Sequence, residues 1–410
     1  VFAAGMAVLP FIHLFMKNNS YSLSYIRVLY AMWLVRTVLS YLLTYRKSLL
    51  IADQKEYIAS ITGLILNVVS YLAIILLVTW EQNYLLALGI GTVTEVVLNI
   101  WISWYVEQKY PFLRQRRKEK STSSLTKRIV RDLKSLFISR ISEKMLYCTD
   151  NLIISGFIGV GTVGRYANYC MITQAISNIL TILANTIQPT VGDYFTEKNR
   201  QRNYEILRQL TFGFFCIASV VSVGLFSLIT PFVRDIWLGP SYELGWGITV
   251  FCIVVLLVRI MGLPLSLVMG VTGLFEKEKN VGASSALLNL IVSLALVKPY
   301  GMAGVLLGTL LSYLLQILYR YIIYFRDFLE MPGEALRYAQ DIGEYLAVIA
   351  GEVLLMQKIV PLIYGAGGML LFCVCFLLCI AIPLLLDLVI FGRGWRLQSI
   401  VTMVKGMRKA

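Results

Sequence analysis

Residues 246–269 read WGITVFCIVVLLVRIMGLPLSLVM, a run of 24 residues with a single charged side chain, Arg259. An apolar run of about 20 residues is long enough to cross the hydrocarbon core of a bilayer as a helix. Strands of a membrane β-barrel would be about half as long and would alternate apolar and polar residues. The stretch therefore predicts a membrane-spanning helix with an arginine near its middle.

The rest of the chain has the same character. Its 410 residues are 58% hydrophobic and 15% charged, with a net charge of +14. Soluble domains are about half apolar and a quarter charged, and neither a disordered chain nor a basic soluble nucleic-acid binder has this composition. Twelve apolar runs predict membrane helices. They are 1–16, 24–45, 57–80, 84–107, 135–158, 163–192, 210–233, 246–269, 280–298, 302–324, 342–360 and 367–391.

The basic residues predict the orientation of these spans. Of the 37 Lys and Arg, 27 fall on the same side as the basic linker 109–134, and five fall on the other side. Because cytoplasmic loops carry the excess of Lys and Arg, the linker and the C-terminus are predicted to be cytoplasmic. The remaining five lie inside apparent spans: Arg27, Arg36, Arg140, Lys144 and Arg259.

Short matches at one spacing predict an internal repeat. The matched segments are Leu9–Ile12 with Thr230–Val233, Leu34–Arg36 with Leu257–Arg259, and Lys55, Glu56 and Asn67 with Lys277, Glu278 and Asn289. The offsets are 221, 223 (259 − 36) and 222 (289 − 67). Such repeats indicate two homologous halves. Projected back to the N-terminus, the repeat implies that the first half lacks two helices here, and that the intact protein has fourteen.

We therefore predict an all-α polytopic membrane protein with two six-helix lobes, related by a pseudo-twofold axis around a cavity. Within the second lobe, Gly304 and Gly308 have the four-residue spacing that is typical of close helix contact. The predicted parts are an N-lobe of four helices at 1–108, the linker 109–134, a C-lobe at 135–325, two further helices at 326–391 and a basic cytoplasmic tail at 392–410.

Arg36 and Arg259 occupy matching positions in matching helices. An arginine at the bilayer centre costs about 2.5–3.5 kcal/mol on insertion scales, so it normally faces protein or a wet cavity. Two lobes that each present an arginine at the same depth predict a shared anion site. The alternative is a structural ion pair, with Glu95 as the candidate partner of Arg36.

Helix 135–158 is the most polar of the predicted spans. Its polar residues fall within an arc of about 120°. They are Arg140, Glu143, Lys144, Tyr147, Asp150 and Asn151. Arg140 and Lys144 are one turn apart and suit one phosphate group. Glu143 and Asp150, like Glu95, are candidates to balance charge or to couple a cation or a proton. The alternative is a salt-bridge ladder without a ligand.

The motifs of cofactor and metal chemistry are missing from the sequence. It contains no Walker A loop, no metal-ligand cluster and no nucleophile elbow. We therefore predict no cofactor, apart from a coupling cation or proton.

Several segments resemble one family. They are YRKSLLIADQK at 45–55, KYP at 109–111, TDNLIIS at 149–155, VGRYANY at 163–169 and YGMAGV at 300–305. These segments are similar to Wzx-type flippases, the polysaccharide-transporter branch of the multidrug/oligosaccharidyl-lipid/polysaccharide exporter superfamily. The resemblance covers most of 1–391 and departs at the N-terminus, where the first two helices of the family have no counterpart.

The resemblance implies a transporter rather than an enzyme. Such proteins move undecaprenyl-diphosphate-linked oligosaccharides across the bacterial inner membrane by alternating access, driven by an ion gradient or the membrane potential. The implied partners are the lipid-linked oligosaccharide, membrane lipids and polysaccharide polymerase or assembly proteins, without nucleic acid. On this hypothesis Arg36, Arg140, Lys144 and Arg259 offset the diphosphate charge in a cationic cavity, for capsule, exopolysaccharide or O-antigen assembly.

Three alternatives stay open. A peptidoglycan-precursor flippase carries a similar diphosphate lipid, so charge alone does not exclude it. A multidrug or cation antiporter of the same fold needs an acidic cavity, whereas the matched intramembrane pair here is Arg36 and Arg259. A glycosyltransferase or polymerase predicts a large extramembrane loop or an acidic sugar-donor motif, whereas the longest internal gap, 109–134, is short and basic.

Overall fold

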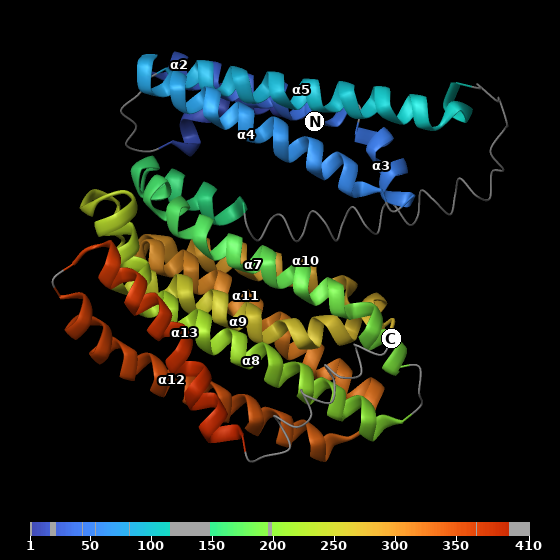
Figure 1. The fold of residues 1–410 in the computed structure, drawn as a ribbon, viewed down its shortest axis with the longest axis vertical. Helices are drawn as coiled ribbons and strands as arrows, with labels where there is room; N and C mark the ends of the chain where they lie inside the picture. The colour runs from blue at the N-terminus through green and yellow to red at the C-terminus, as the bar shows by residue number, and fades with distance from the viewer. Residues whose placement is uncertain are drawn as a thin grey trace. The chain divides into compact units, whose positions relative to one another are not determined.

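The computed structural model describes the chain in eight stretches and separates it into two units. The described residues are 2–16, 22–42, 44–53, 55–81, 83–114, 148–195, 199–365 and 367–392, and their regular elements are all helices. The units are Val1–Val130 and Arg131–Ala410, so the division falls inside the predicted linker 109–134. Each unit is described by itself below, and the predicted lobe layout stays a prediction (Figure 1).

The N-terminal unit is built around α5. Its elements are α1 (Phe2–Val8), the 3₁₀ helix η1 (Leu9–Phe15), α2 (Leu23–Leu42), α3 (Thr44–Ala52), α4 (Glu56–Glu81), α5 (Tyr84–Lys109) and the 3₁₀ helix η2 (Pro111–Arg114). The side chain of Asn83 caps α5 by accepting a hydrogen bond from the Leu85 amide. α5 packs against α2, α3 and α4, and Figure 1 shows it alongside α4. A small core of Leu50, Ala59, Ile102 and Val106 closes the end of the unit near α3.

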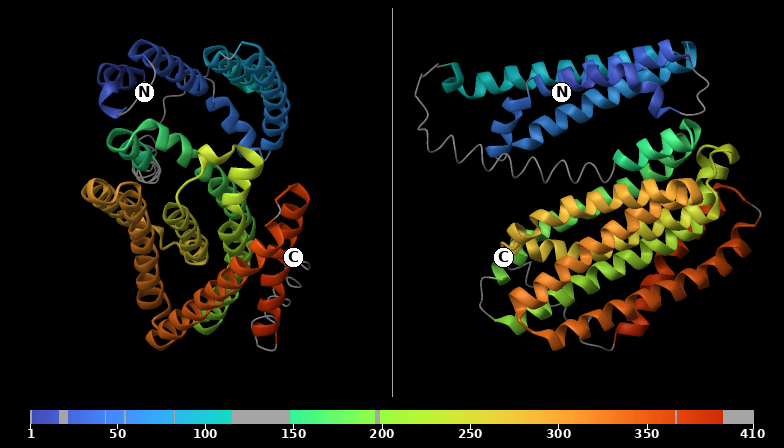
Figure 2. Two further views of the ribbon diagram at one scale, coloured as in Figure 1. Left: turned by 90° about the vertical axis from the view of Figure 1, so that its left-hand side faces the viewer. Right: turned by 180° about the vertical axis from the view of Figure 1, so that it is seen from behind.

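The C-terminal unit contains the longer helices. Residues 148–157 are helical. The further elements are α7 (Val160–Phe195), α8 (Arg200–Pro231), the π-helix η3 (Phe232–Trp237), the 3₁₀ helix η4 (Pro240–Tyr242), α9 (Trp246–Val271), α10 (Phe275–Tyr300), α11 (Met302–Ile323), the π-helix η5 (Tyr324–Leu329), α12 (Pro332–Tyr364) and α13 (Met369–Phe391). α9 packs against α7, α8 and α11, while α12 and α13 pack against α8, as the views in Figure 2 show.

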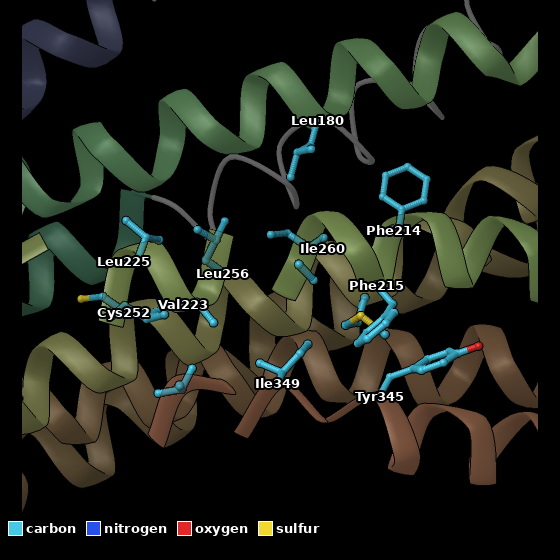
Figure 3. Packing of buried hydrophobic residues seen from close by; sticks show 14 of the residues in the cluster. Leu180, Phe214, Phe215, Val223, Leu225, Cys252, Leu256, Ile260, Tyr345 and Ile349 are labelled. Carbon is cyan, nitrogen blue, oxygen red and sulfur yellow. The ribbon is translucent and has the colours of Figure 1, made fainter. Parts of the chain in front are cut away.

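The core of this unit lies around α8. Figure 3 shows Phe215 of α8 beside Tyr345 of α12, with ring centroids 4.4 Å apart in a stacked arrangement. Phe391 of α13 meets Phe215 edge to face at 5.5 Å. In a bilayer, van der Waals packing of this kind drives helix association, because lipid tails are as apolar as the side chains themselves. These rings therefore attach the two C-terminal helices to α8.

α10 and α11 approach each other through two glycines. A Cβ atom at Gly304 would lie 2.3 Å from the carbonyl oxygen of Leu296, and one at Gly308 would lie 2.4 Å from Ser293 Oγ. Such distances leave no room for a larger residue. The close contact expected from the four-residue glycine spacing is confirmed.

Nine helices in the described part of the chain are long and apolar enough to cross a membrane. They are Tyr57–Glu81, Tyr84–Lys109, Val160–Gly192, Arg200–Trp237, Trp246–Val271, Val281–Tyr300, Met302–Leu329, Pro332–Tyr364 and Met369–Phe391. Each covers all or most of one of the predicted spans. Of the other three, 1–16 forms α1 followed by η1, 24–45 forms α2 and the start of α3, and 135–158 is described only from residue 148. The count of twelve stays a prediction.

Matching positions of the repeat have matching structure within each unit. α5 packs against α2 and α4, and α11 packs against α9 and α10. α1 gives way to the 3₁₀ helix η1 beside Pro10, and α8 gives way to the π-helix η3 beside Pro231. Because proline removes a backbone donor, both irregular turns fall where the α-helical ladder is interrupted.

Candidate functional site

A pocket of about 350 Å³, with charged and polar groups on a largely apolar wall, lies between helix 148–157, α7, α9 and α11. This volume is in the range of small-molecule sites. Its walls carry two of the predicted site residues, Asp150 and Arg259. The other lining residues are Asn151, Tyr166, Cys170, Met171, Thr173, Gln174, Cys252, Val255, Leu256, Leu306, Thr309 and Tyr313. The pocket thus combines both signs of charge with uncharged polar groups inside an otherwise apolar bundle.

Arg259 reaches the pocket from the middle of α9. The buried neighbours Leu256 and Ile260 hold this part of the helix against the core, which fixes the direction of the arginine. Its guanidinium carbon lies 5.5 Å from the ring centroid of Tyr313 on α11. A cation–π contact of this kind contributes about 0.5–2 kcal/mol and leaves the formal positive charge in place. Arg259 therefore presents a cation, steadied by an aromatic ring, on the wall of the pocket.

Asp150 belongs to a buried polar cluster that joins helix 148–157, α10 and α11. Thr309 Oγ1 donates to Asp150 Oδ2 at 2.7 Å, and Asn289 Nδ2 donates to Thr309 Oγ1 at 2.8 Å and to Asp150 Oδ1 at 3.5 Å. Asp150 is only 4% exposed. Beside it, Ser293 Oγ donates to the carbonyl oxygen of Val305 at 3.2 Å. The cluster holds a carboxylate by neutral donors on two other helices.

The cluster has spare acceptor capacity. Among the residues that the structure describes, the buried Asn289 Oδ1 has no hydrogen-bond partner, and the donors to Asp150 are a hydroxyl and an amide. A buried carboxylate in a membrane segment is costly unless a positive charge or a proton compensates it. The oxygens of Asp150 and Asn289 and the hydroxyl of Thr309 are groups that a small cation or a proton would bind.

Arg36 has a different environment in the N-terminal unit. Its Nη2 lies 3.3 Å from Glu95 Oε2 of α5, and the two side chains are 28% and 37% exposed. The guanidinium carbon also lies 5.2 Å from the ring centroid of Trp33, one turn back on α2. Gly91 leaves room for it, since a Cβ there would lie 2.9 Å from Arg36 Nη1. The structure therefore contains the ion pair that the sequence analysis gives as the alternative for Arg36, and Glu95 balances its charge.

Three predicted site residues, Arg140, Glu143 and Lys144, lie outside the described residues. Their phosphate-binding and charge-balancing roles stay predictions. Arg36 and Arg259 belong to different units, so the shared anion site also stays a prediction.

The acidic residues of α12 and α13 are functional candidates that the sequence-based predictions do not include. Arg208, which the charge count places in a cytoplasmic gap, lies inside α8 and forms a bidentate pair with Asp341, at 2.6 Å from Nε to Oδ2 and 3.0 Å from Nη2 to Oδ1. Glu352 and Asp387 are also buried. Both stand inside predicted spans, and an ionisable residue in such a place is a functional candidate by default. The pattern that marks the arginines in the sequence, a charged residue inside an apolar run, also marks Glu352 and Asp387.

Fold and site together define a polytopic membrane protein with a charged pocket inside its helix bundle. Residues 1–195 match the family described as "Polysaccharide biosynthesis protein". The structure is similar to that of the lipid II flippase MurJ in its inward closed conformation, with a TM-score of 0.65 and 16% identity over 95% of this chain and 80% of that chain. Comparison with curated protein sequences gives no match. Both findings agree with the resemblance to polysaccharide transporters, the first over residues 1–195 and the second in the fold.

Proposed function

We propose that this protein is a flippase for lipid-linked oligosaccharides with a diphosphate headgroup. The observation that carries the proposal is Arg259 on the wall of a pocket of about 350 Å³ inside the helix bundle, beside Asp150 and uncharged polar groups. The match of residues 1–195 to polysaccharide biosynthesis proteins supports the substrate class. A solved protein with a similar fold is a lipid II flippase, which supports the type of movement.

The pocket supplies groups for both parts of such a substrate. A guanidinium binds phosphate oxygens bidentately, so Arg259 takes the diphosphate while the Tyr313 ring holds it from the side. Polar groups around it, such as Gln174 and Asn151, suit sugar hydroxyls. The lipid tail stays in the bilayer, and rocking of the two halves exposes the headgroup to the opposite leaflet.

The predicted cations on the other helices complete this scheme. We assign the same role to Arg140 and Lys144 of the predicted helix 135–158, with Glu143 as their balancing acid. Arg36 contributes from the first half, where Glu95 holds it in the state described here. Substrate phosphate then competes with the Glu95 carboxylate for the guanidinium of Arg36.

Asp150 is the residue to which we assign ion coupling. Its carboxylate, Asn289 Oδ1 and Thr309 Oγ1 offer oxygen ligands from three helices, and secondary transporters bind their coupling ions at such sites in the bundle. A cation or proton there neutralises Asp150 beside the pocket that contains Arg259. Its arrival and departure thereby change the charge that the headgroup meets.

The proposal places the protein in the bacterial plasma membrane as a multi-pass secondary transporter. The linker 109–134 and the C-terminus are cytoplasmic on this account, because of the distribution of Lys and Arg. Its partners are the lipid-linked oligosaccharide, membrane lipids and the polymerase or assembly proteins of the same polysaccharide.

Complementation of a polysaccharide-flippase-deficient strain tests the proposal. Charge reversal by Arg259→Glu or Arg36→Glu, with membrane expression verified by immunoblot, should abolish polysaccharide production. Arg165→Glu is the matched control, since Arg165 is an exposed arginine on α7 outside the pocket lining. Full activity of both charge-reversed variants would remove the anion site from the account.

The structural similarity to MurJ favours one second candidate, a peptidoglycan-precursor flippase. A strain depleted of its own lipid II flippase distinguishes the two candidates. Growth restored in that strain, without polysaccharide restored in the other, would select the peptidoglycan precursor as substrate. A multidrug or cation antiporter is separated from both by drug-sensitivity assays.

A further inference from the structure

Two acidic side chains are buried where α12 and α13 meet α8, inside segments apolar enough to cross the membrane. Glu352 on α12 is 2% exposed and Asp387 on α13 is 4% exposed. They flank the fully buried Ser219 on α8. This place is separate from the pocket described above, which lies between helix 148–157, α7, α9 and α11.

The packing of α8 and α12 fixes the position of Glu352. The two helices run parallel, because Arg208 pairs with Asp341, Ser219 with Glu352, and Asp235 with Tyr364. Ser219 Oγ donates its one proton to Glu352 Oε2 at 2.6 Å. Asp387 lies close enough to Glu352 for the two carboxyl groups to interact electrostatically.

Three of the four carboxyl oxygens at this place have no donor. Within the described stretches of the chain, Glu352 Oε1 and both Asp387 oxygens are buried and lack a hydrogen-bond partner. A buried acceptor without a donor costs about 1–3 kcal/mol, and more when it is charged. A positive charge or a proton bound by the two side chains would therefore stabilise them.

Within the part of the chain that the structure describes, the charged and titratable groups near the pair do not supply this positive charge. On α8, the thiol of Cys216 is a neighbour of both acids. Arg208 stands 11 residues before Ser219, about 16 Å along the helix axis, where its Nε and Nη2 donate to Asp341. On α12 and α13 the ionisable neighbours are Glu352 and Asp387 themselves. Two ionised carboxylates in this apolar setting would repel each other and lose their hydration.

We propose that Glu352 and Asp387 together bind one proton in the α8–α12–α13 bundle. The bound proton removes one of the two negative charges. Two neighbouring buried carboxyl groups hold a proton in this way when they cannot both ionise. Chains of acidic residues inside membranes carry protons, so the pair offers a point where a proton gradient acts on α12 and α13, apart from Asp150.

Infrared spectroscopy of the full chain in lipid nanodiscs tests the proposal. A protonated carboxylic acid has a carbonyl stretch that a carboxylate lacks. At neutral pH the double variant Glu352→Gln with Asp387→Asn should lose the intensity of one such group relative to the wild type. Glu344→Gln, an exposed position on α12, is the matched control and should lose none. An unchanged band in the double variant would overturn the proposal.

Two further measurements cover a bound metal ion and a double variant that does not fold. If Na⁺ in place of choline removes the band from the Asp150→Asn variant, the pair holds a metal ion rather than a proton, and the proposal is wrong. If the double variant does not elute as a folded monodisperse species, the wild type labelled with ¹³C-aspartate and ¹³C-glutamate replaces it, in an Asp150→Asn background. A protonated carboxyl band shifted by the label supports the proposal, and absence of any such band overturns it.

Discussion

Arg36 and Arg259 occupy matching positions of the predicted repeat and contact different side chains. The helix that faces them is α5 in one unit and α11 in the other. Gly91 of α5 corresponds to Tyr313 of α11, and Glu95 to Ile317, both at an offset of 222 (313 − 91 and 317 − 95). In the N-terminal unit the facing helix supplies an acid to the arginine. In the C-terminal unit it supplies an aromatic ring, with an isoleucine in place of the acid.

The two matched positions are both arginine, but the side chains that contact these arginines differ. Arg36 is part of an ion pair, whereas Arg259 stands on a pocket wall that also carries Asp150. The C-terminal unit thus holds a pocket whose wall carries both signs of charge.

The largest expected effect is on transport. Arg259→Gln should lower the transport rate by roughly 10- to 100-fold, because a hydrogen bond to a charged group contributes about 1.5–3 kcal/mol. Arg36→Gln should lower it less, since Glu95 already competes for that guanidinium. Flux of labelled lipid-linked oligosaccharide in proteoliposomes measures both, with Arg165→Gln as the control. A greater loss in Arg36→Gln would reverse the comparison.

The next effect compares an ion pair in each unit. Asp341→Asn should lower the free energy of unfolding by about 1.5–3 kcal/mol, because it removes the charged partner of two hydrogen bonds from the half-buried Arg208. Glu95→Gln should change it by no more than about 1 kcal/mol, because both partners are partly exposed and make one contact at 3.3 Å. Thermal unfolding of the purified variants gives the two values. Equal losses would mean that Arg36 and Glu95 are as firmly held as the buried pair.

A smaller effect compares two glycines at the same kind of helix contact. Gly304→Ala should destabilise the protein by about 1–3 kcal/mol, because its Cβ would meet the backbone of Leu296 at 2.3 Å. Gly91→Ala should cost less, because its Cβ would meet the flexible end of Arg36. Gly351→Ala on α12, with open space around it, is the control for helix propensity. A tolerated alanine at Gly304 would contradict the packing of α10 on α11.

The smallest expected effect is a pH dependence of stability that arises from Asp53 in the N-terminal unit. Hydrogen bonds from Lys55 and Tyr110 lower the pKa of the exposed Asp53 carboxyl below its ordinary value. A carboxyl whose pKa is lower in the folded protein contributes stability above its unfolded pKa and loses it as the pH falls through the folded pKa. Asp53→Asn should therefore lower the melting temperature slightly at pH 7, and the difference from the wild type should disappear once the pH falls below the lowered folded pKa of Asp53. A difference that persists in acid would assign another role to Asp53.

The sequence was sufficient for the helices and for part of the site. Runs such as 246–269 and 367–391 predict α9 and α13, because few structures other than a membrane helix accommodate so many apolar residues in a row. The sequence also identifies Asp150 and Arg259, because a charged residue inside a membrane span is costly and is therefore a functional candidate. Their meeting in one pocket was not predictable, because it depends on which helices pack together over more than 100 residues of chain. Asn289 and Thr309 were missed as partners of Asp150 for the same reason.

Binding of undecaprenyl diphosphate tests the central claim most directly, namely that the pocket of the C-terminal unit takes an anionic headgroup through Arg259. Affinity is measured by microscale thermophoresis for the wild type, Arg259→Gln and the control Arg165→Gln in the same nanodiscs. The account predicts that Arg259→Gln weakens binding by at least about 10-fold, equivalent to 1.4 kcal/mol, while Arg165→Gln binds as the wild type does. Equal affinity of Arg259→Gln and the wild type would contradict it.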